Sequence, residues 1–153
     1  MRSLRCRCAT MATTLLLLAG TAAPAPAEEL TISILHTTDL HGALAAWDEA
    51  NDRPAARGLE KLATMVTAAR AEGHPTLLLD AGDALFGNAL VRTWREGPRT
   101  GPEPVISAMN ALGYDAMAVG NHEFDGGRAV LDSAIAEARF KFLAANVVEA
   151  ASG

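Results

Sequence analysis

Three stretches of the sequence each end an apolar run with a cluster of polar side chains. They are LHTTDLHG at 35–42, LLDAGD at 78–83 and AVGNHEFD at 118–125. A strand that ends in this way places polar side chains at its carboxyl end, where open α/β sheets bind their ligands. Carboxylate, imidazole and amide groups can all bind divalent cations. The three stretches therefore predict one metal site assembled from three strand ends.

The first two stretches offer carboxylates and an imidazole. Asp39 and His41 are two residues apart, so an extended or tightly turned segment can direct both toward one ion. The alternative is an aspartate that caps a turn beside an unrelated histidine. Asp83 follows Gly82, where the missing side chain lets the backbone turn sharply and present a carboxylate that can bridge two cations. Asp80 is the competing carboxylate, although an acid at the end of a buried strand can instead orient its neighbours through hydrogen bonds.

The third stretch is the most specific of the three. Asn121 offers a neutral amide oxygen, which suits a metal site already crowded with negative charge. His122 is too close to it in sequence to be assumed a ligand of the same ion, and is better placed to protonate a leaving group or stabilise a phosphoryl oxygen. Asp125 can hold that imidazole in one tautomer and support its cation. For Glu123, capping of the helix that begins at Arg128 is an alternative role.

The elements that must position these residues alternate between strands and helices. Apolar residues that alternate, or form short runs, predict strands, and apolar residues spaced by three and four predict helices. The predicted strands are Leu30–Leu35, Thr76–Leu79, Ala116–Val119 and Phe142–Ala145. The predicted helices are Arg57–Ala71, Leu85–Arg95, Pro102–Leu112 and Arg128–Arg139, and 43–56 is predicted as a loop. This order predicts an α/β fold with a mostly parallel sheet covered by helices.

Two finer expectations concern burial. The run Thr76–Leu79 is wholly apolar, which is typical of a strand buried on both faces of a parallel sheet. In the last helix, Leu131, Ile135 and Ala138 are in register and predict its inward face.

The first 27 residues have the features of a cleaved secretory signal rather than of a buried N-terminal helix. Three arginines precede an apolar segment too short to span a bilayer comfortably, and Ala25-Pro26-Ala27 fits an A-x-A cleavage site. We therefore expect an exported protein, periplasmic or secreted, without stable insertion in the membrane. Both cysteines, Cys6 and Cys8, lie in this segment, so the mature chain has no disulfide or thiolate ligand.

The charge of the mature chain limits its partners. Without the three arginines of the signal, ten basic residues stand against 18 acidic ones, a formal charge of −8. An acidic surface argues against nucleic-acid polymers and anionic membranes as partners. A small phosphorylated substrate is still compatible, because bound divalent cations can reverse the local sign of the charge.

The runs ILHTTDLHG, LLLDAGD and GNHEFD, in this order and spacing, resemble the calcineurin-like metallophosphoesterases. Within that family they are most similar to the secreted 5′-nucleotidase and UDP-sugar hydrolase branch. The resemblance covers nearly all of the mature chain and implies a metallophosphoesterase-type α/β sandwich with a two-metal site at strand ends. It also implies hydrolysis of a nucleotide phosphate ester by in-line attack of a metal-bound hydroxide.

Matched position by position, the resemblance assigns roles to the polar residues of the three stretches. The implied ligands of two divalent ions, zinc, manganese or similar, are Asp39, His41, Asp83 and Asn121. Of these, Asp83 would bridge both ions. His122 and Asp125 would form the catalytic dyad.

The sequence also departs from the family pattern. The family completes its site with histidines from later strands, in GH and GHxH segments, and this sequence has no histidine beyond His122. His36 lies on the apolar face of the first predicted strand, which predicts a core histidine, and His74 lies in a loop, which predicts a solvated one. We expect the C-terminal substrate domain typical of the branch to lie outside this sequence as well. We therefore expect 28–153 to be the N-terminal portion of a metallophosphoesterase domain.

Two alternatives to a 5′-nucleotidase stay open. The first is another activity of the same family, on 2′,3′-cyclic nucleotides or UDP-sugars. The second is a catalytically incompetent fragment that binds metal weakly because the later histidines are lacking.

Overall fold

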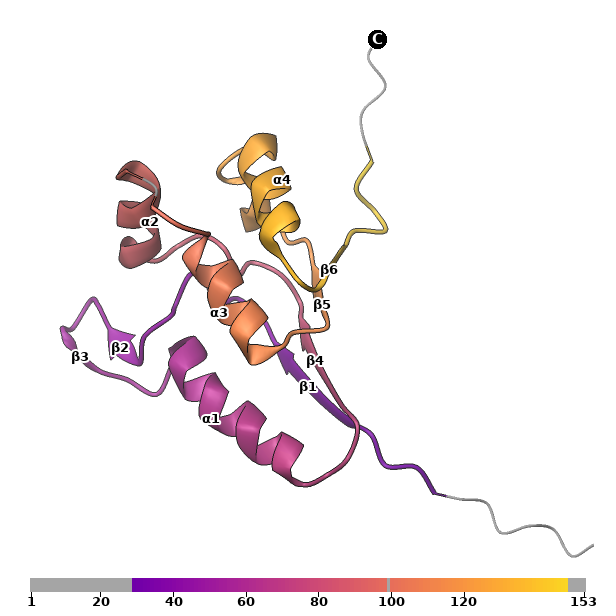
Figure 1. Ribbon diagram of the computed structural model, residues 1–153. Helices are drawn as coiled ribbons and strands as arrows, with labels where there is room; N and C mark the ends of the chain where they lie inside the picture. Colours follow the sequence, from indigo (N-terminus) through magenta and orange to yellow (C-terminus); the bar gives the residue numbers. More distant parts are fainter. Residues whose placement is uncertain (1–28, 99, 149–153) are drawn as a thin grey trace, which may run out of the picture.

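A four-stranded sheet organises the computed structural model, which describes residues 29–98 and 100–148 (Figure 1). In spatial order the strands are β1 (Ser33–Thr37), β4 (Thr76–Asp80), β5 (Ala116–Ala118) and β6 (Lys141–Leu143). Each neighbouring pair in this sheet is parallel. The predicted α/β fold with a mostly parallel sheet is confirmed.

Four α-helices lie in the crossovers that parallel strands require. They are α1 (Gly58–Ala71), α2 (Ala89–Glu96), α3 (Pro104–Leu112) and α4 (Arg128–Glu137). A short 3-10 helix, η1 (His122–Phe124), precedes α4. The predicted loop over 43–56 contains a small antiparallel pair of strands, β2 (Trp47–Asp48) and β3 (Arg53–Pro54).

Capping side chains set where α2 and α3 begin. The Asn88 side chain accepts the backbone N–H of Leu90, so α2 begins at Ala89, four residues later than predicted. Gly87 has a φ of +125°, which no helix accommodates. The Glu103 side chain accepts the N–H of Ile106 at the start of α3.

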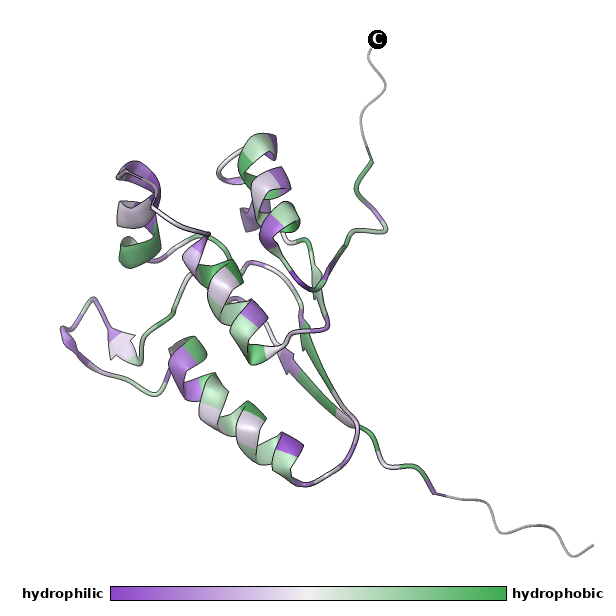
Figure 2. Ribbon diagram, in the orientation of Figure 1, coloured by the Kyte–Doolittle hydropathy of each residue, from purple (hydrophilic) through white to green (hydrophobic). Residues whose placement is uncertain are grey.

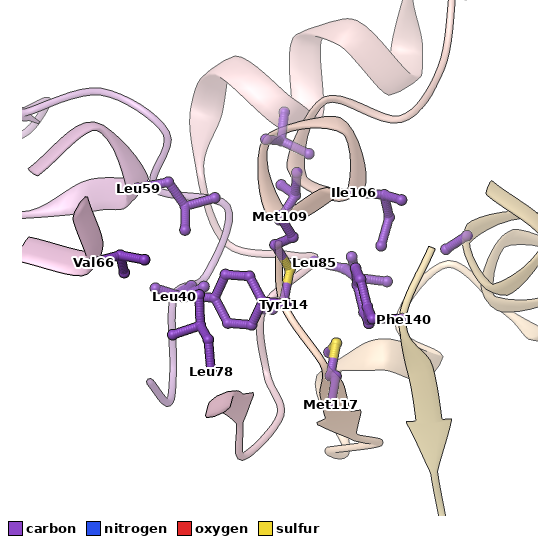
Figure 3. Packing of buried hydrophobic residues seen from close by; sticks show 14 residues of the cluster. Leu40, Leu59, Val66, Leu78, Leu85, Ile106, Met109, Tyr114, Met117 and Phe140 are labelled. Atoms are coloured by element: carbon purple, nitrogen blue, oxygen red, sulfur yellow. The ribbon is translucent and has the colours of Figure 1, made fainter. Parts of the chain in front are cut away.

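The hydrophobic core lies between the sheet and the helices. Figure 3 shows Tyr114 packed beside Leu40 and Leu78, within a cluster that also contains the fully buried Met109 of α3 and Met117 of β5.

Helix α4 contributes Leu131 and Ala134 to the buried side, whereas Ile135 is exposed. The predicted inward position of Ile135 is therefore wrong. Both Ala134 and Ile135, three and four residues after Leu131, have a spacing that fits the buried side of a helix. In the folded chain Ala134 packs against the core and Ile135 does not.

Within the part of the chain that the structure describes, helices cover only one face of the sheet, since α1, α3 and α4 lie on the same side of it (Figure 1). On the other face Ile34, Leu77 and Leu143 are 63%, 43% and 57% exposed, although β4 is largely hydrophobic (Figure 2). The prediction of a strand buried on both faces is therefore wrong for β4. His36 lies on this bare face and is exposed, so the predicted core histidine is wrong as well. Alternation shows which side chains share a face, but not whether anything covers it.

Strand β1 begins at Ser33, three residues later than predicted, and continues to Thr37. Its partner β4 sets these limits, because the pairing runs from Ser33 opposite Thr76 to Thr37 opposite Asp80. The predicted secretory signal, 1–27, lies outside the described residues. Across 29–98 and 100–148, none of the helices combines the length and the apolar content needed to cross a bilayer.

Candidate functional site

The three polar stretches meet at the carboxyl edge of the sheet. Beyond β1 and β4 the backbones stay side by side: the N–H of Asp39 donates to Gly82 O (3.0 Å) and the N–H of His41 donates to Asp83 O (2.9 Å). Gly82 in turn lies against Gly120, since a Cβ on Gly82 would approach Gly120 N to 2.7 Å. Residues more than 80 positions apart therefore line one edge, as the strand-end pattern predicted.

The imidazole of His41 is held in one orientation. Its Nδ1 lies 3.0 Å from the carbonyl oxygen of Phe86. A carbonyl can only accept, so Nδ1 carries a proton, and in the neutral ring Nε2 is the nitrogen left to bind a metal. Nε2 lies 3.6 Å from Asp39 Oδ1. Orientation of one ring nitrogen by a carbonyl oxygen is the usual arrangement for a histidine that binds metal through the other.

Asp83 joins the second and third stretches. Its Oδ1 accepts the backbone N–H of His122 at 2.8 Å. Gly120 is required beside it, because a Cβ at that position would overlap the Asp83 carboxylate. The rings of His41 and His122 lie edge to face with centroids 5.1 Å apart. Asp83 therefore contacts both other stretches, through its backbone oxygen to His41 and through its carboxylate to His122.

His122 and Asp125 make the contact that their spacing predicted. His122 Nδ1 lies 2.8 Å from Asp125 Oδ2, and both side chains are about half exposed. The hydrogen bond to Asp125 raises the pKa of His122, and the negative charges of Asp125, Asp83 and Glu123 act in the same direction. This imidazole is thereby favoured in its cationic form, which can donate a proton from Nε2. The catalytic role of the pair stays a prediction.

Within the described residues the set of metal ligands is incomplete. Among 29–98 and 100–148, no three histidine, cysteine, aspartate or glutamate side chains are grouped so that they could hold a metal ion. The donor chemistry of Asp39, His41, Asp83 and the exposed Asn121 fits divalent cations, and the orientation of His41 fits a ligand. These four residues supply part of a metal site, and their roles as ligands stay predictions.

Asp80 belongs to a buried network rather than to the exposed edge. Its Oδ2 accepts the hydroxyl of Thr37 (2.5 Å), its Oδ1 accepts the N–H of Gly82 (2.8 Å), and the Thr37 hydroxyl lies 2.9 Å from that of Tyr114. Burial raises the pKa of Asp80 to about 6 and that of Tyr114 to about 12. The alternative in which Asp80 orients its neighbours is thus confirmed.

Glu123 was missed by the prediction. It is 0% exposed, and it does not cap α4, whose N-cap is Gly127 and has no side-chain bond. The helix-cap alternative is therefore wrong. Its Oε2 instead accepts the N–H of Gly120, three residues earlier, at 2.7 Å. Glutamates of capping boxes bond at the same three-residue spacing, so this one contact could have been expected from the sequence.

A cleft of about 300 Å³ adjoins the dyad. Its lining residues are Phe86, Gly87, Asn88, Val91, Arg92, Arg95, Glu96 and Asp125. It offers apolar surface, two arginines and the carboxylate of Glu96 beside a carboxylate of the predicted catalytic pair.

Known proteins resemble this chain in sequence. The calcineurin-like phosphoesterase family profile matches residues 32–149. The 2′,3′-cyclic-nucleotide 2′-phosphodiesterase/3′-nucleotidase of Yersinia enterocolitica is 35% identical over 140 residues, which are 90% of this chain and 22% of the relative. The 5′-nucleotidase of Bos taurus is 42% identical over 123 residues, which are 76% of this chain and 20% of the relative. The chain spans about a fifth of the length of these relatives.

The fold resembles a solved structure as well. The calcineurin-like phosphoesterase YfkN from Bacillus subtilis superimposes with a TM-score of 0.67 at 38% sequence identity, covering 73% of this chain and 36% of that one. All three polar stretches lie inside the range that the family profile matches. Sequence and fold therefore agree on one family.

Proposed function

The chain belongs to the calcineurin-like phosphoesterase family, and from that membership we propose that its protein hydrolyses phosphate esters of nucleotides with the help of divalent metal ions. The observation that carries this proposal is the grouping of Asp39, His41 and Asp83 with the His122–Asp125 pair at one edge of the sheet. Five polar side chains from three distant stretches share a place where a phosphoryl group can approach.

In the proposed site Asp39, His41, Asp83 and Asn121 would hold the divalent cations. When bound, such ions stabilise charge on phosphoryl oxygens and lower the pKa of water. The other groups belong to the chain itself. His122, whose pKa is raised by the hydrogen bond to Asp125, donates a proton from Nε2 to the oxygen of the leaving group. The carbonyl of Phe86 keeps the His41 ring in place while substrate binds.

The substrate proposal rests on the relatives, whose names specify 5′-nucleotidase and cyclic-nucleotide activities. A nucleoside monophosphate has a phosphate for the strand-end groups and an organic part for the cleft beside Asp125. AMP, 2′,3′-cyclic AMP and UDP-glucose, assayed side by side with Mn²⁺ or Zn²⁺, distinguish the three activities of the family. Faster hydrolysis of AMP than of the other two supports the 5′-nucleotidase activity. Faster hydrolysis of 2′,3′-cyclic AMP or of UDP-glucose would replace that proposal with the corresponding activity.

The alternative is a protein without catalytic activity, favoured by the incomplete ligand set of the described residues. Release of nitrophenol from p-nitrophenyl phosphate in Mn²⁺ or Zn²⁺ would exclude this alternative. With AMP, whose alkoxide leaving group needs a proton, we expect His122→Ala to lower the rate of phosphate release by about 10²-fold or more, on the order of general acid catalysis. The exposed His74 provides the control, and His74→Ala should leave the rate unchanged. Absence of any metal-dependent rate in the unsubstituted protein would overturn the proposal.

Export is proposed as well, on the arginines, the apolar segment and the Ala25-Pro26-Ala27 site of the first 27 residues. N-terminal sequencing of the protein recovered outside the cytoplasm should begin at Glu28. Recovery of the product with Met1 in the cytoplasm would contradict it.

A further inference from the structure

Glu123 is a carboxylate buried without exposure to solvent inside η1. Such a group is stable only when hydrogen bonds replace the water it has lost. Four backbone N–H groups do this. Oε2 accepts from Asp83 (2.8 Å) and Gly120 (2.7 Å), while Oε1 accepts from Ala84 (2.8 Å) and Leu85 (3.2 Å).

These donors belong to two separate loops. Three successive N–H groups, those of 83–85, come from the loop after β4 and all donate to this one carboxylate, an arrangement that suits an anion. The fourth, from Gly120, comes from the loop after β5. One carboxylate therefore joins the loop that carries Asp83 to the loop that carries Asn121 and His122.

The join is reciprocal. Asp83 donates its N–H to Glu123, and the Asp83 side chain accepts the N–H of His122, the residue before Glu123. The spacing is also tight, because a Cβ on Gly120 would overlap the Asp83 carboxylate. A shift of either loop would therefore move the Asp83 carboxylate relative to His122.

We propose that Glu123 is a positioning residue, whose buried carboxylate fixes the Asp83 loop against the Asn121–His122 loop. The effect of this role on metal binding and catalysis rests on the proposed function, since the two loops carry a predicted bridging ligand, a second ligand and the predicted acid. Glu123 acts through backbone amides, and its side chain is not exposed to a metal or a substrate.

Glu123→Gln tests this with little change in shape. A glutamine has one carbonyl oxygen, which can serve two of the four donors, and its NH₂ faces the other two. The diagnostic readout is amide hydrogen exchange of His122 in metal-free protein. The His122 N–H bonds to Asp83 and not to Glu123, so it reports on the position of the Asp83 carboxylate. We expect its protection to fall by about tenfold or more, together with that of the four donors.

Glu137→Gln is the matched control. Glu137 is a partly buried glutamate whose Oε2 also accepts a backbone N–H, that of Glu103, far from the strand ends. It should leave the protection of the His122 amide unchanged. Unchanged protection of His122 in folded Glu123→Gln would overturn the proposal. If that variant does not fold, Glu123→Asp, which keeps the charge on a shorter side chain, is measured with the same readout and the same criterion.

A second readout links positioning to the site. Mn²⁺ binding, measured by calorimetry, should weaken by about 10- to 100-fold in Glu123→Gln, as for other residues that orient ligands, and by less than about twofold in Glu137→Gln. The exchange measurement needs neither metal nor substrate, so it separates the two proposals. Unsubstituted protein that binds no Mn²⁺ and hydrolyses nothing, yet shows the expected exchange pattern, contradicts the proposed function and leaves the positioning role standing.

Discussion

Left-handed backbone marks the strand-end loops at the scale of single residues. Asp39, His41 and Asp83 have φ values of 53°, 47° and 60°. This conformation costs a residue with a Cβ about 1–2 kcal/mol, so surrounding contacts must hold it. Here the backbone bonds from Asp39 to Gly82 and from His41 to Asp83 do so. Backbone strain of this kind gathers at functional sites, in agreement with the roles proposed for these three residues.

Asp80 provides a prediction about pH. Its pKa is raised from 3.8 to about 6 by burial, so between pH about 4 and 6 the folded state retains a proton that the unfolded chain has released. The free energy of unfolding therefore falls as the pH rises through this window, by on the order of 3 kcal/mol from this group. Asp80→Asn should remove that contribution, because an uncharged amide can still accept from Gly82 and donate to Thr37.

Urea unfolding at pH 4.5 and 7.5 checks this expectation. The quantity to compare is the free energy of unfolding of Asp80→Asn minus that of the unsubstituted protein. This difference should be more positive at pH 7.5 than at pH 4.5. A stability difference that is the same at both pH values would show that Asp80 does not titrate in this range.

At the scale of elements, a buried ion pair ties α2 to α3. The guanidinium of Arg95, at the end of α2, lies 3.0 Å from Glu103, the N-cap of α3, and 3.7 Å from the centre of the Phe86 ring. Phe86 in turn fixes His41 through its carbonyl. The packing of two helices therefore supports the orientation of a predicted ligand.

Two cap substitutions should differ in cost because their surroundings differ. Glu103→Ala removes a helix cap and leaves the Arg95 guanidinium buried without this partner, which should lower the free energy of unfolding by about 3–5 kcal/mol. Asn88→Ala removes only the cap of α2, with an expected loss of about 1 kcal/mol. Chemical denaturation of both variants measures the difference. Equal losses of free energy of unfolding in the two variants would mean that the ion pair with Arg95 contributes no stability beyond that of the helix cap.

At the scale of the whole molecule, the bare face of the sheet is the feature with physical consequences. Parallel sheets are usually covered on both faces, and exposed apolar patches promote association. Ile34 and Leu77 are opposite each other in the register of β1 and β4 and form part of this patch. We expect residues 29–148, produced alone, to self-associate through it.

The double variant Ile34→Thr/Leu77→Thr should reduce self-association in sedimentation velocity, while the free energy of unfolding changes by less than about 1 kcal/mol. Leu78→Thr is the matched control on the covered face, 1% exposed, and should cost about 2–4 kcal/mol. Unchanged association of the double variant would locate the contact elsewhere.

Much of the fold could be predicted from the sequence, because local patterns carry it. Apolar periodicity located all four strands of the main sheet and all four helices, with errors of a few residues where a cap or a partner strand set the boundary. The contact of His122 with Asp125 followed from three-residue spacing. The pair β2 and β3 was not predicted, because two-residue strands leave no periodic signal.

Residue type and spacing determined that this chain alternates strands with helices and gathers Asp39, His41, Asp83, Asn121 and His122 at strand ends, since the carboxyl ends of parallel strands share one edge. Only the tertiary structure decided which face of the sheet is covered, so that His36 is exposed, and where the carboxylate of Glu123 goes. Four of the hydrogen bonds that bury Glu123 come from backbone amides, which every residue but proline carries. For that reason no pattern of side chains in the sequence predicts this set of four hydrogen bonds.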